Sequence, residues 1–128
     1  MLDCEIIGFR DTNKRCCYIT PFSLIHILSG VALNLVFKKL HPNLRYKFYY
    51  ALTIHTIYEL KDMYINYKTD GPFYTNKWAY KKSNTLGNSI GDTFAFILGY
   101  YIGIYVNDPI FILIYLLSAV TFYKLKIN

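Results

Sequence analysis

The chain has 128 residues, of which 54% are hydrophobic and only 17% are charged. This length leaves room for one domain and excludes a two-domain enzyme, a large barrel or a doubly wound dinucleotide-binding fold. Soluble domains carry about 25% charged residues, so the composition favours an integral membrane protein. The net charge of +6 suits an anionic membrane surface or a nucleic acid. Because the apolar residues gather in long runs, we expect membrane lipid as a partner and no nucleic acid.

Four apolar segments predict an all-α fold, a four-helix transmembrane bundle that forms a single membrane domain over residues 1–128. The predicted spans are residues 19–37, 44–60, 86–106 and 109–123. The first and third are long enough for a hydrocarbon layer of about 30 Å, whereas the second has a short uncharged centre. Asn107 and Asp108 before Pro109 form a helix-start signal. This short connection predicts that the last two helices form an antiparallel hairpin.

Basic residues are distributed unequally between the two sides of this predicted bundle. The N-terminal segment, the loop after the second span and the C-terminal tail together hold ten Lys and Arg residues, against four on the opposite side. Because basic residues concentrate on the cytoplasmic side of membrane proteins, we expect a multi-pass protein with both termini in the cytoplasm.

Small residues recur every four positions along the third span: Gly87, Gly91, Ala95, Gly99 and Gly103. In lipid, helices attract one another mainly through close backbone approach, which a strip of small residues permits. We expect the strip to pack against another helix of the same bundle. The alternative is a homo-oligomer in which two copies meet through Gly99 and Gly103.

Polar side chains also lie within three of the spans. Ionisable groups cost roughly 2.5–3.5 kcal/mol each inside a bilayer, so they need partners or a function. The second span carries His55 and Glu59 on one helical stripe, and the third carries Asn88 and Asp92 one turn apart. We expect these four to meet near the cytoplasmic leaflet, with His26 of the first span as a further member.

Carboxylates and imidazoles in one pocket can exchange protons near neutral pH, so these five residues are candidate catalytic groups. Four of them, His26, His55, Glu59 and Asp92, also offer nitrogen and oxygen ligands that a divalent ion accepts. Because no H-E-x-x-H signature is present, we expect no cofactor, and a divalent metal is the alternative. Lys81 and Lys82, before the third span, are candidate substrate-binding residues for a lipid phosphate, and Asp62 is a further substrate-binding candidate. The simpler alternatives are a solvated Asp62 and ordinary cytoplasmic lysines.

Residues 88–92, Asn-Ser-Ile-Gly-Asp, resemble an N-S-x-G-D motif of uncharacterised small multi-pass bacterial membrane proteins. In those proteins a preceding helix carries a His-x-x-x-Glu pattern, which residues 55–59 match. More distantly the layout is similar to the VanZ-like membrane family. The resemblance covers about residues 53–103. After the His-x-x-x-Glu part, the family pattern favours Glu followed by Asn, whereas this chain has Asp62 followed by Met63. The resemblance implies that the polar positions matter, but it implies no particular reaction.

Two functions therefore remain open from the sequence. The first is a small intramembrane enzyme that acts on a lipid or lipid-linked phosphate through the His/Glu/Asn/Asp cluster. The second is a non-enzymatic assembly or accessory protein in which the same polar residues form a structural network between helices. Ion conduction ranks last, because the third and fourth spans lose most of their polarity beyond Asp92.

Overall fold

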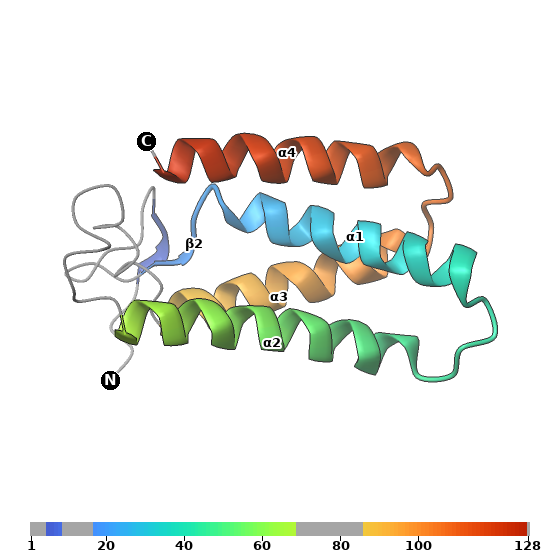
Figure 1. The fold of residues 1–128 in the computed structure, drawn as a ribbon, viewed down its shortest axis with the longest axis horizontal. Helices are drawn as coiled ribbons and strands as arrows, with labels where there is room; N and C mark the ends of the chain where they lie inside the picture. The colour runs from blue at the N-terminus through green and yellow to red at the C-terminus, as the bar shows by residue number, and fades with distance from the viewer. Residues whose placement is uncertain (1–4, 9–16, 69–85, 128) are drawn as a thin grey trace.

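The computed structural model describes residues 5–8, 17–68 and 86–127, and it is mainly helical (Figure 1). The helices are α1 (Ser23–Leu40), α2 (Lys47–Lys68), α3 (Leu86–Gly103) and α4 (Ile110–Ile127). The all-α class is thus confirmed. The predicted segments match the helices to within a few residues, except that α2 continues well past residue 60. Before α4, the Asp108 carboxylate accepts a hydrogen bond from the Ile110 amide at 3.0 Å, as expected of a helix cap.

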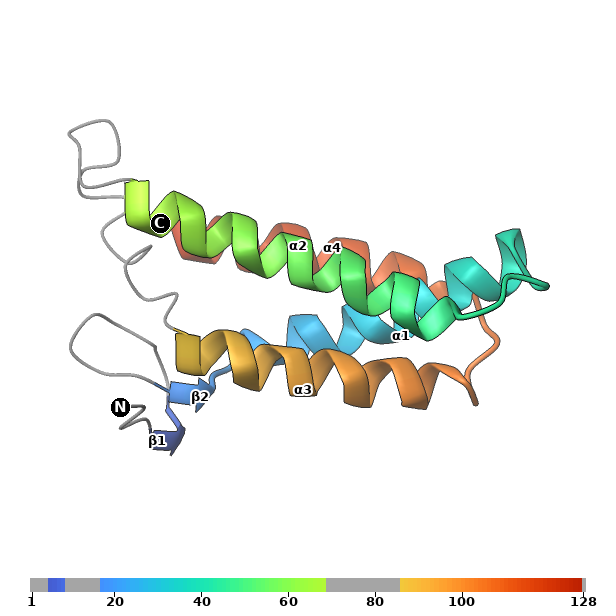
Figure 2. The same ribbon diagram turned by 90° about the horizontal axis from the view of Figure 1, so that it is seen from below.

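Two short strands, which the sequence analysis did not predict, lie at one end of the helices. Strands β1 (Glu5–Ile7) and β2 (Cys17–Ile19) pair in parallel, and the Gly8 amide extends the ladder with a 2.9 Å bond to Ile19. Strand β2 lies against α3 (Figure 2). A Cβ atom added at Gly91 would fall on the backbone carbonyl of Tyr18. Gly91 therefore packs on a strand and not on a helix, which corrects one position of the predicted strip.

Helices α1 and α3 run parallel to each other, whereas α2 and α4 run in the opposite direction (Figure 1). Helix α1 contacts each of the other three helices, and its contact with α3 is the most extensive. The starts of α1 and α3 and the ends of α2 and α4 lie at the same end of the bundle as the strands (Figures 1 and 2). This arrangement brings polar residues of α1, α2 and α3 to that end.

The interface between α1 and α3 depends on glycine. Gly30 of α1 lies against the Phe96 carbonyl and the Tyr100 amide of α3, and a Cβ atom added at Gly99 would fall on the Ile27 carbonyl. A Cβ atom at Gly103 would lie 2.9 Å from the Asn34 Cβ. The prediction that the strip packs against a helix of the same chain is therefore confirmed for Gly99 and Gly103. Self-association through these two residues stays a prediction.

The end of this interface farthest from the strands is held by side chains that bind the backbone. Asn34 Nδ2 donates a 2.8 Å hydrogen bond to the Tyr100 carbonyl. Lys38 Nζ donates to the carbonyl oxygens of Gly103, Ile104 and Val106 at 2.6, 2.8 and 3.0 Å. These carbonyls lie at the end of α3, where the helix dipole favours a cation.

Among the described residues, one helix is long and apolar enough to cross a membrane. It is α1, with 18 residues and a mean hydropathy of 1.4. The apolar part of α4, Ile110–Thr121, is shorter.

Candidate functional site

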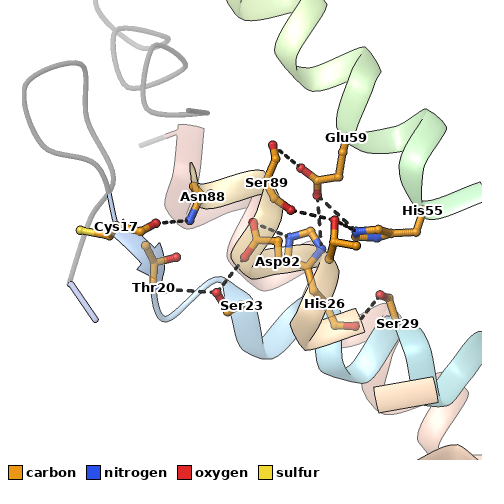
Figure 3. Close-up of polar contacts among 11 residues, drawn as sticks. Cys17, Thr20, Ser23, His26, Ser29, His55, Glu59, Asn88, Ser89 and Asp92 are labelled. Carbon is orange, nitrogen blue, oxygen red and sulfur yellow. Dashed lines mark hydrogen bonds and ion pairs between the residues drawn. The ribbon is translucent and has the colours of Figure 1, made fainter. Parts of the chain in front are cut away.

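His26 lies between two carboxylates at the end of the bundle near the strands (Figure 3). Its Nε2 atom is 3.2 Å from Asp92 Oδ2, and its Nδ1 atom is 3.5 Å from Glu59 Oε1. His26 comes from α1, Glu59 from α2 and Asp92 from α3. The imidazole of a residue on α1 therefore lies between a carboxylate from α2 and a carboxylate from α3.

His55 completes this group on the side of α2. Its Nε2 atom is 3.9 Å from Glu59 Oε1 and 3.2 Å from the hydroxyl of Thr93. The His55 ring stacks on Phe96, with centroids 4.5 Å apart, and meets the His26 ring edge-on at 5.4 Å. We call His26, His55, Glu59 and Asp92 the carboxylate–histidine cluster.

Serine hydroxyls hold the two carboxylates of the cluster from the outside. Ser23 Oγ donates to Asp92 Oδ1 at 2.7 Å and itself accepts a 3.1 Å bond from the Thr20 amide. Ser89 Oγ donates to Glu59 Oε2 at 2.9 Å. Each carboxylate thus presents one oxygen to a serine and the other to an imidazole (Figure 3). Such fixed partners orient the carboxylates and limit their rotation.

The cluster is buried but not closed. The side chains of His55 and Asp92 are 4% and 6% exposed, and those of Glu59 and His26 are 11% and 20% exposed. A small molecule or ion therefore reaches the cluster most readily at His26.

Helix geometry explains why these residues meet. Because α1 and α3 are parallel and closely packed, the second turn of α3 lies beside the first turn of α1, and Asp92 reaches Ser23, the first residue of α1. The positive end of the α1 dipole favours a carboxylate at that point. On α2, the spacing of four residues places His55 and Glu59 on the face toward the other two helices.

The structure brings together four of the five candidate catalytic residues: His26, His55, Glu59 and Asp92. The fifth, Asn88, is directed to β2, where its Nδ2 atom donates a 2.9 Å bond to the Cys17 carbonyl. Its position differs from the expected one because β2, absent from the sequence prediction, supplies an acceptor on that side of α3.

The candidate substrate-binding residues lie outside what the structure describes. Lys81 and Lys82 belong to residues 69–85, and Asp62 lies in α2, but its side chain is not among those described. Their proposed roles stay predictions.

Three residues near the cluster were missed by the sequence analysis: Ser23, Ser89 and Thr93. Each hydroxyl contacts a cluster side chain. The available signal was their spacing, because Ser89 and Thr93 lie within one turn of Asp92. Short hydroxyl side chains are common in apolar helices, and they often bond to their own backbone, as Thr93 does to the Ser89 carbonyl.

An apolar groove of about 530 Å³ lies next to the cluster on the strand side of α1 and α3. Its walls are mainly hydrophobic and include Ile19, Ile27, Phe94 and Leu98, and two hydroxyl-bearing residues, Tyr18 and Ser23, also line it. Because the Ser23 hydroxyl also donates to Asp92, this serine connects the groove with the cluster.

None of the family models, curated proteins or solved structures compared with this chain matches it. The resemblance to small multi-pass bacterial membrane proteins and to the VanZ-like family stays a prediction.

Proposed function

We propose that the chain is a multi-pass membrane protein whose four helices all cross or enter the bilayer. Large apolar side chains are exposed on every helix, and soluble proteins rarely expose contiguous apolar surface on this scale. Those more than half exposed include Leu24 and Leu40 on α1, Ile57 and Leu60 on α2, Phe94 and Leu98 on α3, and Leu113 and Leu117 on α4. The excess of basic residues in the segments joined to the end that carries the strands supports a cytoplasmic location for that end.

Within this membrane protein, the carboxylate–histidine cluster is the active site of an enzyme that acts on a lipid or lipid-linked phosphate. The observation that carries this proposal is the position of His26 between Asp92 and Glu59. An imidazole that faces two carboxylates can deliver or accept a proton, or can serve as a ligand, while the carboxylates act as bases. Partial exposure at His26 supplies the access that a substrate needs.

The apolar groove supports a lipid as the substrate. Its hydrophobic walls fit an acyl chain, and one of its hydroxyl-bearing residues, Ser23, lies against Asp92. A lipid whose chain occupied this groove would hold its polar part close to the cluster. Ligand sites commonly combine such apolar walls with a few polar groups that fix orientation.

A second candidate function is a non-enzymatic membrane component in which the cluster fixes the register of three helices. One observation favours it: every carboxylate oxygen of Glu59 and Asp92 has a partner within the chain. Fully paired polar networks are a recognised way to specify helix packing.

Isosteric substitutions separate the two candidates. The purified full-length protein is reconstituted into vesicles of the host cell's total lipid, and the lipids are quantified by mass spectrometry over time. For the enzyme, we expect Glu59→Gln and Asp92→Asn to keep the fold and to reduce lipid turnover by about 100-fold or more. The control is Thr53→Val on α2, because the exposed hydroxyl of Thr53 bonds to the Tyr49 carbonyl of its own helix and its loss should leave turnover unchanged. Absence of turnover in the unmodified protein, together with unfolding of both carboxylate variants, would favour the structural role.

A further inference from the structure

We infer that the carboxylate–histidine cluster binds one divalent transition-metal ion of the Zn²⁺ type, with His26 Nδ1, His55 Nε2 and Glu59 Oε1 as ligands. Within the described parts of the chain, these three residues form a group whose ligand atoms all lie within 4.8 Å of one another. The inference deepens the proposed function, and it rests on that proposal only for the role of the ion in lipid chemistry.

The spacing of the three atoms fits a metal centre. Glu59 Oε1 is 3.5 Å from His26 Nδ1 and 3.9 Å from His55 Nε2. With bonds of about 2.0–2.2 Å, the ligands of a tetrahedral ion are about 3.3–3.6 Å apart. The Glu59 oxygen therefore needs shifts of only a few tenths of an ångström relative to each imidazole. The ligand atoms of the two histidines lie within 4.8 Å of each other, so the two rings would have to move closer together when an ion binds. Two histidines and one carboxylate are also a common catalytic zinc set, which leaves a fourth position open.

The surroundings of these atoms match those of ligands at known metal centres. A histidine ligand normally donates its other ring N–H to a carboxylate, and a carboxylate ligand is itself hydrogen-bonded. His26 Nε2 faces Asp92 Oδ2 at 3.2 Å, and the Ser23 hydroxyl orients that carboxylate. Ser89 does the same for the second oxygen of Glu59. His26 can therefore present Nδ1 to an ion while Nε2 keeps its proton.

Charge balance favours the same conclusion. Glu59 and Asp92 bring two negative charges into a region where their side chains are only 11% and 6% exposed. Buried charges are normally paired with an opposite charge or bound to a metal ion. If a divalent cation binds and both imidazoles are neutral, the ion and the four cluster residues together have a net charge of zero.

Metal binding is measured on the purified full-length protein after treatment with a chelator. Zn²⁺ is titrated in competition with a chromophoric chelator, and Co²⁺ absorption reports the ligand set. We expect one ion per chain, bound through nitrogen and oxygen. Asp92→Asn, which spares the three ligands, should weaken Zn²⁺ binding about 10–100-fold. Glu59→Gln and His55→Phe should weaken it at least as much, and the phenyl ring of the latter can still stack on Phe96.

The matched control is His41→Gln, because His41 is an exposed histidine beyond the end of α1. Zn²⁺ affinity should not change in this variant, and circular dichroism should show equal helix content in all variants. The inference is overturned if the unmodified protein binds no Zn²⁺ or Co²⁺, or if the cluster variants bind as tightly as His41→Gln. If lipid turnover persists in chelator-treated protein, the ion is not needed for the reaction, and the proposed function still holds. Stoichiometric Zn²⁺ binding without lipid turnover would uphold the metal site and reject the enzyme.

Discussion

The two ends of the α1–α3 interface use polar side chains in different ways. At the end far from the strands, Asn34 and Lys38 donate to backbone carbonyls of α3 and the residues after it. Those acceptors hold no proton and cannot move independently of the backbone. At the end near the strands, His26 and Asp92 face each other as side chains, with Glu59 on the far side of the imidazole. The first arrangement can only hold the helices together, whereas the second can also exchange a proton or hold an ion.

The largest expected effect comes from the interface that both ends share. Gly99→Leu would place a side chain on the Ile27 carbonyl, so α1 and α3 would have to separate. We expect a loss of at least about 3 kcal/mol in the free energy of unfolding. The measurement is denaturant unfolding in detergent, followed by circular dichroism. Gly103→Ala is the milder companion, because its nearest new neighbour is the Asn34 Cβ atom at 2.9 Å. An equal loss in both variants would contradict this account of the interface.

Lys38→Met tests the purely structural end. The variant keeps the apolar stem and loses the bonds to three carbonyl oxygens. Because bonds to charged groups contribute about 1.5–3 kcal/mol each at most, and this site is only partly buried, we expect a net loss of about 2 kcal/mol. Lipid turnover and Zn²⁺ affinity should stay unchanged. Lys39→Met, at the exposed neighbouring position, is the control and should leave stability unaltered.

Ser23→Ala and Asn34→Leu form a pair that sharpens the comparison. Each removes one buried hydrogen bond between α1 and α3, so Asn34→Leu should cost about 1–2 kcal/mol in the same unfolding experiment. Ser23→Ala also removes the bond from the Thr20 amide, so it should cost somewhat more. Only Ser23→Ala frees the Asp92 carboxylate, so it alone should weaken Zn²⁺ binding. Equal Zn²⁺ affinity in the two variants would show that Ser23 does not position Asp92.

Thr93→Val should have the smallest effect. It removes the hydroxyl that lies 3.2 Å from His55 Nε2, the atom assigned as a metal ligand. A metal ion and this hydrogen bond compete for the same nitrogen. We therefore expect Zn²⁺ affinity that is unchanged or slightly higher, with a stability loss below about 1 kcal/mol. A marked fall in affinity would mean that Thr93, and not the nitrogen alone, holds the ion.

The helices were predictable because long apolar runs separated by charged residues seldom form any structure other than buried or membrane-spanning helices. The glycine spacing also predicted a close helix contact, and Gly99 and Gly103 make it. The sequence could not say which helix is the partner, because the spacing marks a face of α3 and carries no information about α1. Complementary small residues, such as Gly30, are too common to select one partner.

The cluster was partly predictable because ionisable residues in apolar helices are costly. This cost singled out His55, Glu59 and Asp92, but the central position of His26 follows from the parallel pairing of α1 and α3, which no local pattern encodes. The destination of Asn88 depended on β2, and three-residue strands leave almost no signal in a sequence. Local sequence patterns therefore do not predict contacts between segments that are far apart in the chain.

The parallel pairing of α1 and α3 also fixes an order of assembly. Ser23 and its partner Asp92 are separated by 69 residues, and the whole of α2 is synthesised between them. During synthesis, the polar side chains of α1 emerge from the ribosome before their partners on α3 have been made. Such long-range contacts form late, after shorter-range ones. The cluster is therefore complete only once α3 has been made, and a chain that stalls before α3 has the three proposed metal ligands but lacks Asp92.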